Sequence, residues 1–243
     1  MVSSLSRVQV CEQQACHYQQ GETLMKQKLK VWDLPTRLFH WLLVLSIAFM
    51  WYSADVGGNM LVWHLRCGLF ILALMVFRLC WGIWGSDTAR FAQFIRGPAQ
   101  IKRYLRGDLS ENEQPGHNPL GALMVLALIG GIFFQVGTGL FAADENTFLN
   151  NGYLNSLVSS ATGSQLRTIH TTFFNLLLAL IAIHVSTVIF YKLFKKHDLI
   201  KPMFTGYKYL EGKLPILKFA STPKLLAAVA VAIAVVAIII SMA

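Results

Sequence analysis

Long apolar runs, each bounded by polar residues, recur five times along the chain. They cover approximately residues 39–54, 62–84, 119–142, 166–194 and 225–242. Each run is close to the ~20 residues that an α-helix needs to cross the hydrocarbon core of a bilayer. The pattern therefore predicts an all-α membrane protein with five transmembrane helices and leaves no room for a separate soluble domain.

Polar and small residues indicate where these helices begin and end. Two of the predicted helix starts combine a side chain suited to the N-cap with a proline in the first turn: Asp33 with Pro35, and Asn118 with Pro119. Residues 57–59 are Gly, Gly and Asn, which predict a short turn after the first helix. Between the second and third helices, residues 98–106 predict a short surface helix.

Composition and charge support a membrane protein and orient it. Charged residues make up 14% of the chain, whereas a soluble domain has about 25%. The net charge of +9 is concentrated before the first span, between the second and third, and after the fourth. This alternation is the positive-inside pattern, which predicts a cytoplasmic N-terminus and a C-terminus outside. The basic loops are therefore expected to contact anionic lipid, and nucleic-acid binding is not favoured.

The four cysteines do not predict a disulfide framework. Cys67 and Cys80 lie within the second span, where a thiol behaves as a small apolar residue. Cys11 and Cys16 belong to the predicted cytoplasmic tail, which is a reducing environment. With His17 they form C-x4-C-H, whose spacing differs from the C-x-x-C-H of covalent haem attachment.

The fourth apolar run contains two histidines, His170 and His184, fourteen residues apart. In a helix they lie about 21 Å apart along the axis and within about 40° of the same face. Because the hydrocarbon core is about 30 Å thick, one histidine is placed near each membrane surface. Polar residues at this depth are costly and indicate function.

Two further histidines supply a partner at each depth. The first span runs outward and places His40 near the cytoplasmic side, whereas the second runs inward and places His64 near the outer side. Topology therefore pairs His40 with His184, and His64 with His170. Facing imidazoles are the usual axial ligands of low-spin b-type haem, so the pattern predicts a four-helix bundle that holds two haems. The alternative, histidines that only hydrogen-bond between helices, accounts less well for two depth-matched pairs.

Four arginines lie near the predicted ligands. Arg37 and Arg167 each precede a ligand by three residues, Arg66 is beside the outer pair, and Arg78 lies at the depth of the inner pair. Haem propionates are anionic and need cationic partners, a role that suits all four residues. Arg37, Arg66 and Arg167 are equally well explained as side chains that snorkel to the interface.

Motifs across the chain resemble those of a known family. They are VWDLPTRLFHW, HLRCG with the following Arg78, RGP at 96–98, GHNPLG, QVGTGLFA and the paired histidines of the fourth span. From about residue 30 to residue 206 the chain resembles the prokaryotic cytochrome b561 family, which includes the b-type cytochrome subunits of Ni/Fe hydrogenases. The resemblance implies non-covalent haem b, with iron bound by His40, His64, His170 and His184, and electron exchange with the quinone pool.

These observations predict three regions and a respiratory role. Residues 1–30 are expected to be a cytoplasmic tail, 31–206 the dihaem domain, and 207–243 a linker with the fifth helix. The leading hypothesis is an electron-transfer subunit of an oxidoreductase, without catalytic residues of its own, in a bacterial inner membrane. It would connect quinone with a cytochrome c, a hydrogenase or another periplasmic dehydrogenase, and His117 is a candidate polar contact for quinone.

Two alternatives remain open on the sequence. The first is a superoxide:ubiquinone oxidase, for which Arg66 and Arg167 offer only a thin basic outer surface. The second is a non-redox transporter or scaffold with structural histidines. Transporters usually carry carboxylates within their spans, and no Asp or Glu lies deep in any span of this chain.

Overall fold

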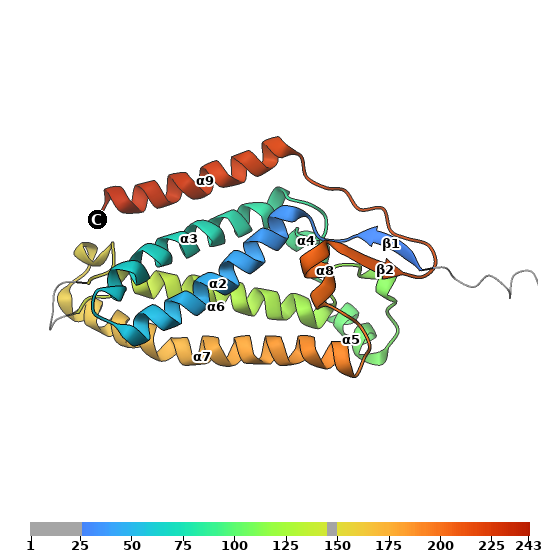
Figure 1. Cartoon of the computed structure of the whole chain (residues 1–243), viewed down its shortest axis with the longest axis horizontal. Helices are drawn as coiled ribbons and strands as arrows, with labels where there is room; N and C mark the ends of the chain where they lie inside the picture. The colour runs from blue at the N-terminus through green and yellow to red at the C-terminus, as the bar shows by residue number, and fades with distance from the viewer. Residues whose placement is uncertain (1–25, 145–149) are drawn as a thin grey trace, which may run out of the picture.

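Five long helices dominate the computed structural model, which describes residues 26–144 and 150–243 (Figure 1). Within these residues, all five are long and apolar enough to cross a membrane. The predicted all-α membrane fold is confirmed. The helices are α2 (Leu34–Val56), α3 (Met60–Trp84), α6 (Pro119–Phe141), α7 (Ser160–Leu193) and α9 (Thr222–Ser241).

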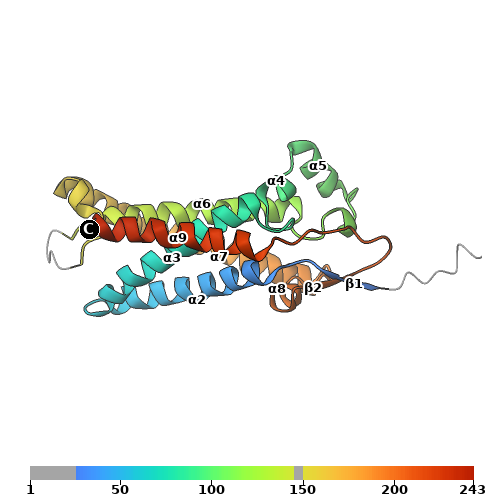
Figure 2. The same cartoon turned by 90° about the horizontal axis from the view of Figure 1, so that it is seen from above.

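Shorter elements gather at the two ends of the long helices (Figure 2). One end, called here the basic end, carries β1 (Gln27–Lys30), α4 (Phe91–Phe94), α5 (Pro98–Arg106), α8 (Ile200–Thr205) and β2 (Tyr207–Leu210). The 3-10 helix η1 (Glu111–Glu113) lies in the connection between α5 and α6. The opposite end, called the far end, carries the turn at residues 57–59 and the 3-10 helix η2 (Asn155–Leu157).

Helix starts follow the capping chemistry that the sequence predicts. The Asp33 carboxylate accepts a hydrogen bond from Thr36 N at 2.8 Å, and the Asn118 side chain accepts one from Gly121 N at 2.7 Å. Each cap satisfies a backbone donor that the first helical turn leaves without a partner. The predicted surface helix at 98–106 is present as α5.

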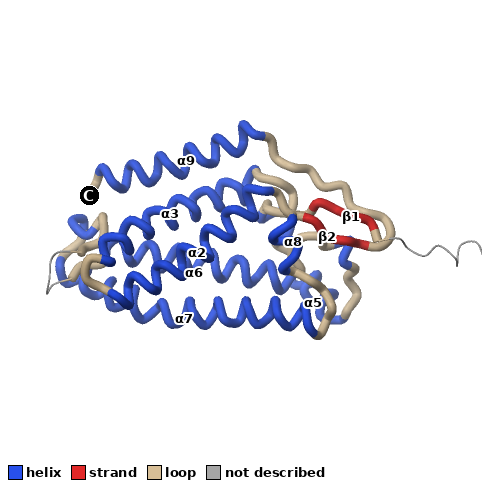
Figure 3. The backbone as a smooth tube through the Cα atoms, in the orientation of Figure 1, coloured by secondary structure: helices blue, strands red, loops and turns tan. Residues whose placement is uncertain are grey.

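The long helices pack in pairs. α2 packs along α3, α6 packs along α7, and α3 also contacts α6, which joins the two pairs into a bundle. The described parts of α2 and α7 do not pack closely against each other. The fifth span, α9, lies outside the bundle along α3 (Figures 1 and 3), where Ala228 and Ala232 are buried.

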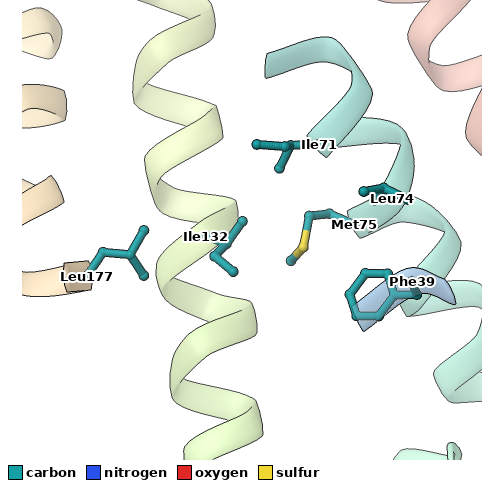
Figure 4. Packing of buried hydrophobic residues seen from close by; sticks show 6 residues of the cluster. All are labelled: Phe39, Ile71, Leu74, Met75, Ile132 and Leu177. Atoms are coloured by element: carbon teal, nitrogen blue, oxygen red, sulfur yellow. The ribbon is translucent and has the colours of Figure 1, made fainter. Parts of the chain in front are cut away.

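An apolar cluster lies midway along the bundle and joins its four helices (Figure 4). Met75 of α3 is fully buried, and Ile132 of α6 and Leu177 of α7 are 5% and 2% exposed. Leu177 is seven residues from each histidine of α7. The part of the cluster around Leu177 therefore lies between the two depths at which the histidines occur, and Phe39 extends it to the level of His40. Its members are Phe39, Ile71, Leu74, Met75, Ile132 and Leu177.

A two-stranded antiparallel sheet, which the sequence did not predict, ties the start of the bundle to the segment after α8 (Figure 3). β1 pairs with β2 so that Gln27 faces Leu210. The backbone N–H groups of Val31 and Trp32 both donate to Gly206 O, at 2.8 and 3.1 Å. The sheet therefore links residues on both sides of the range 31–206, and the predicted division into three regions stays a prediction.

The linker between β2 and α9 lies over the loops that follow α3. Lys218 N donates to the Asp87 carboxylate at 2.8 Å, and Ala220 N donates to Ser86 Oγ at 3.0 Å. Farther out, the Asn112 side chain donates to Glu211 O at 2.6 Å. These bonds fix the linker against the basic end before α9 begins.

Candidate functional site

At the far end, the rings of His64 and His170 face each other. Their centroids are 6.2 Å apart and their planes are inclined by 79°. His64 projects from α3 and His170 from α7, so the pair joins helices from both halves of the bundle. The structure thus brings together the two residues that topology paired at the outer depth.

His64 is held by the neighbouring helix α2. Its Nδ1 lies 3.1 Å from Met50 O and 3.2 Å from Ser53 Oγ. A carbonyl oxygen can only accept a hydrogen bond, so Nδ1 carries the proton. Nε2 therefore keeps its lone pair free for a ligand bond.

His170 is held in the same way by α6. Its Nδ1 lies 2.8 Å from Gln135 O and 3.3 Å from Thr138 Oγ1. The Gln135 side chain in turn donates to His170 O at 3.0 Å. The Nε2 lone pair of His170 is therefore also available.

The far-end pair fits an iron between its rings. Metal–imidazole bonds are about 2 Å long, so two such bonds with the two ring radii place the ring centres about 6 Å apart. The observed 6.2 Å matches this separation. Histidines that bind metals usually donate their other ring N–H to a carbonyl, carboxylate or water, and His64 and His170 both do so.

At the basic end, His40 of α2 and His184 of α7 are close enough to interact electrostatically. The His40 ring packs edge-on against Trp41, with centroids 4.8 Å apart. Trp41 stacks on Phe204 of α8 and donates to Met203 O at 3.3 Å. His40 Nδ1 is buried and makes no hydrogen bond within the described part of the chain. Within the described residues, His40 Nδ1 therefore lacks the backbone anchor that His64 and His170 have.

Arg78 is buried at the basic end, with 4% of its surface exposed. Its guanidinium donates to Ala89 O at 3.1 Å, lies over the Phe91 ring at 4.8 Å, and interacts electrostatically with Asp33. Asp33 also accepts a hydrogen bond from Trp81 Nε1 at 3.0 Å. A charge this deep needs such partners, since burying an unpaired cation is costly.

The other three predicted arginines have partners at the helix ends. Arg37 donates to Phe204 O at the basic end. Arg66 is exposed and lies over the Trp63 ring at 5.0 Å, and Arg167 pairs with Asp144 at 2.8 Å. Contact of any of the four arginines with a propionate stays a prediction.

His117 is more enclosed than its sequence position suggested. Its ring lies 4.8 Å from Trp32 and 4.6 Å from Phe94, measured between centroids, and its Nδ1 is buried. Burial, and then the nearby Arg78 and His184, lower the pKa of His117 to about 3. The sequence placed this residue in a loop just outside the membrane, as a candidate polar contact for quinone.

A pocket of about 200 Å³ lies beside His117 at the basic end. Gln114 lines it, and both amide atoms of that side chain are buried without a hydrogen-bond partner within the described residues. Residues 215–217 of the linker complete its wall. The pocket therefore offers polar groups and apolar surface close to the basic-end histidines.

The described residues, 26–144 and 150–243, show no cluster of three or more His, Cys, Asp or Glu side chains that could hold a metal ion. Cys67 and Cys80 are free thiols. Cys11, Cys16 and His17 lie outside the described residues.

Comparison with known proteins decides the family. The family model described as prokaryotic cytochrome b561 matches residues 31–206, which is most of the chain. The chain belongs to the prokaryotic cytochrome b561 family. No curated protein and no solved structure matched the chain in the same comparisons. The predicted family is confirmed, and membership makes this protein a membrane b-type cytochrome that transfers electrons with haem b.

Proposed function

We propose that this b561-family protein holds two haem b groups and passes electrons across the bilayer. His64 and His170 bind one haem near the far end, and His40 and His184 bind the other near the basic end. The far-end geometry carries the proposal, because the rings are 6.2 Å apart and both Nδ1 atoms are anchored to carbonyls. Such anchoring is typical of histidines that bind a metal.

The bundle suits two haems at different depths. α7 supplies one ligand to each pair, and these two ligands are about 21 Å apart along the helix. The apolar cluster around Met75 and Leu177 lies between the pairs. Because α2 and α7 do not pack closely, a flat macrocycle can lie between the two halves of the bundle. The haem supplies the one-electron chemistry, and the protein ligates, positions and insulates it.

Cationic side chains near each pair are the proposed partners of the haem propionates. Arg78 and Arg37 serve the basic-end haem, and Arg66 and Arg167 serve the far-end haem. Arg78 is the strongest of the four, since it is buried and an anion close to it would be stabilised in low dielectric. Arg37 Nε is also buried and makes no hydrogen bond with the described residues.

Charge supports an orientation with the basic end in the cytoplasm of a bacterium and the far end in the periplasm. The connections at the basic end carry most Lys and Arg residues, which the positive-inside rule places in the cytoplasm. In this orientation the N-terminus is cytoplasmic and the C-terminus, after five crossings, is periplasmic.

Quinone and a periplasmic redox protein are the proposed electron partners. The pocket beside His117 is the proposed quinone site, because it combines unpartnered polar atoms with apolar surface near the basic-end pair. A cytochrome c, a hydrogenase or another oxidoreductase would meet the far end. A superoxide substrate is less well supported, because Arg66 and Arg167 give the far end only a small basic surface with which to attract an anion.

Haem quantitation with a reduced-minus-oxidised spectrum tests the two pairs. We expect b-type bands and about two haems per chain in the wild type. His64→Ala and His184→Ala should each lose one haem, and the two variants should lose haems of different potential. His197→Ala is the control, because His197 is exposed and lies outside the spans. One haem in the wild type, or the same haem lost from both variants, would contradict the pairing.

A further inference from the structure

The two far-end histidines are held by the same hydrogen-bonding arrangement on two different helices. On α2, Ser53 Oγ donates to Met50 O at 3.1 Å, and both oxygens face His64 Nδ1. On α6, Thr138 Oγ1 donates to Gln135 O at 2.9 Å, and both oxygens face His170 Nδ1. In each case the hydroxyl follows the carbonyl by three residues.

The two hydroxyls are buried, and their hydrogen-bond partners are the imidazole rings and carbonyl groups of their own helices. Ser53 is 0% exposed and Thr138 is 6% exposed, so water does not compete for them. Each hydroxyl uses its proton for a carbonyl of its own helix and turns a lone pair toward the imidazole N–H. The ring proton is therefore shared between a carbonyl oxygen and a hydroxyl oxygen.

We propose that Ser53 and Thr138 are positioning residues for the far-end haem ligands. They fix the rotation of each imidazole ring about its bond to the iron. They also make the Nε2 atom of each ring a stronger electron donor to the iron. This inference rests on the proposed function, in which His64 and His170 are the ligands. Two acceptors on each Nδ1 proton hold the ring planes near the observed 79° and make each ring more basic.

Two measurable properties follow from these contacts. A more basic ligand stabilises ferric iron, so removal of a hydroxyl should raise the midpoint potential of the far-end haem. The ferric EPR signal of a bis-imidazole haem depends on the angle between the two ligand planes. A ring that is free to turn should therefore shift that signal.

Thr138→Val tests the proposal in the full-length protein, because valine keeps the shape of threonine and removes only the hydroxyl. We expect a higher midpoint potential and a shifted EPR signal for the haem that His64→Ala removes. Thr138→Ser should restore both properties. Thr138 Oγ1 is within hydrogen-bond distance of the carbonyl oxygens three and four residues before it, at 2.9 and 3.0 Å, and Thr171 Oγ1 has the same two acceptors in its own helix, at 3.0 and 3.1 Å. Thr171→Val is therefore the matched control, since Thr171 is adjacent to His170 but is exposed.

Ser53→Ala provides an independent test on the other ligand and should change the same haem in the same direction. Selective loss of the far-end haem from Thr138→Val, reversed by Thr138→Ser, would also support the proposal. Full haem content with unchanged potential and EPR signal in both Thr138→Val and Ser53→Ala would overturn it. So would loss of both haems without restoration by Thr138→Ser, because the hydroxyl would then serve helix packing.

The His64→Ala variant separates failure of this inference from failure of the proposed function. If His64→Ala leaves the haem content of the protein unchanged, the far-end pair itself is wrong. If His64→Ala removes one haem but the hydroxyl variants behave as wild type, the ligands stand and only the positioning role fails.

Discussion

Gly139 of α6 lies directly against the imidazole of His170. A Cβ atom at Gly139 would be 2.8 Å from His170 Cε1 and 3.0 Å from its Nδ1, which is closer than normal contact. The absence of a side chain at this position therefore lets the ring approach α6 and reach Gln135 O. The glycine serves close packing, as small residues often do between membrane helices.

Gly139→Ala should displace the His170 ring and remove the proposed far-end haem or weaken its binding. Alanine favours a helix over glycine by about 1 kcal/mol, so helix propensity alone would stabilise the variant. The matched control is Gly130→Ala in the same helix, where a Cβ atom would meet nothing within 4 Å. Haem content and the visible spectrum report the result. Two haems of unchanged potential in Gly139→Ala would show that the ring tolerates the methyl group.

Asp33 connects the start of α2 to two buried groups of α3. It caps α2 through Thr36 N, accepts the Trp81 indole N–H and interacts electrostatically with Arg78. Asp33→Ala should cost about 1 kcal/mol for the cap and about 1–3 kcal/mol for the buried Trp81 donor, and it leaves Arg78 less well compensated. We expect a clearly lower unfolding temperature in detergent.

A second capping aspartate provides the control for that experiment. Asp198 accepts hydrogen bonds from Ile200 N and Lys201 N at 2.9 and 3.0 Å, but it is exposed. Asp198→Ala should therefore cost only the capping contribution, about 1 kcal/mol. Equal losses of stability in the two variants would show that the buried contacts of Asp33 contribute little.

His117 should make the stability of the protein depend on pH below neutrality. Its pKa in the folded protein is about 3, whereas an exposed histidine titrates near 6.5. Between these values the unfolded chain binds the proton and the folded protein does not. The contribution of neutral His117 to the free energy of unfolding is therefore complete above pH 6.5. It is lost as the pH falls toward 3, by at most about 1.4 kcal/mol per pH unit.

The comparison of wild type with His117→Asn isolates this contribution, because the other histidines are common to both proteins. The unfolding temperature should decrease more from pH 7 to pH 5 for the wild type than for His117→Asn. A variant with the same decrease would show that His117 is exposed to solvent protons in the folded state.

The membrane fold could be predicted from the sequence because its signals are local and periodic. Long apolar runs identify the helices, and single residues such as Asp33 and Asn118 mark helix starts. The fourteen-residue interval on α7 likewise predicted two depths for histidine pairs. These inferences need only the rise of a helix and the thickness of a bilayer.

The features that were missed depend on contacts between distant segments. β1 and β2 have four residues each, and their pairing joins positions far apart in the chain. Four residues are too few for an alternating pattern to predict a strand. The Nδ1 acceptors of His64 and His170 are mainly backbone carbonyls, which every residue type has. The composition of α9 likewise did not specify that it packs on α3.

Shortening the chain tests where the haem-binding unit ends. A chain that stops after Ala220 keeps β2 and the linker bonds to Ser86 and Asp87, and it should retain both haems without α9. A chain that stops after Gly206 loses β2 and those bonds. We expect it to lose the basic-end haem or to unfold at a lower temperature. Equal haem content and stability in the two chains would place the boundary at residue 206.

The two proposed haems should differ in midpoint potential, with the far-end haem the lower of the two. His64 and His170, the proposed far-end ligands, each share their Nδ1 proton with a carbonyl oxygen, which would make them stronger donors and stabilise ferric iron. At the basic end, His40 Nδ1 makes no such bond within the described residues, and the buried Arg78 cation is nearby. A nearby positive charge in low dielectric favours the reduced iron, which carries one positive charge fewer.

A redox titration of the wild type, His64→Ala and His184→Ala assigns a potential to each site. We expect His64→Ala to lose the lower-potential component and His184→Ala the higher one. Arg78→Gln should lower the potential of the basic-end haem and leave the far-end haem unchanged. This order makes electron transfer from the far end to the basic end favourable, toward the pocket beside His117. The reverse assignment would mean that solvation or other charges outweigh the ligand hydrogen bonds, and electrons would then be expected to leave at the far end.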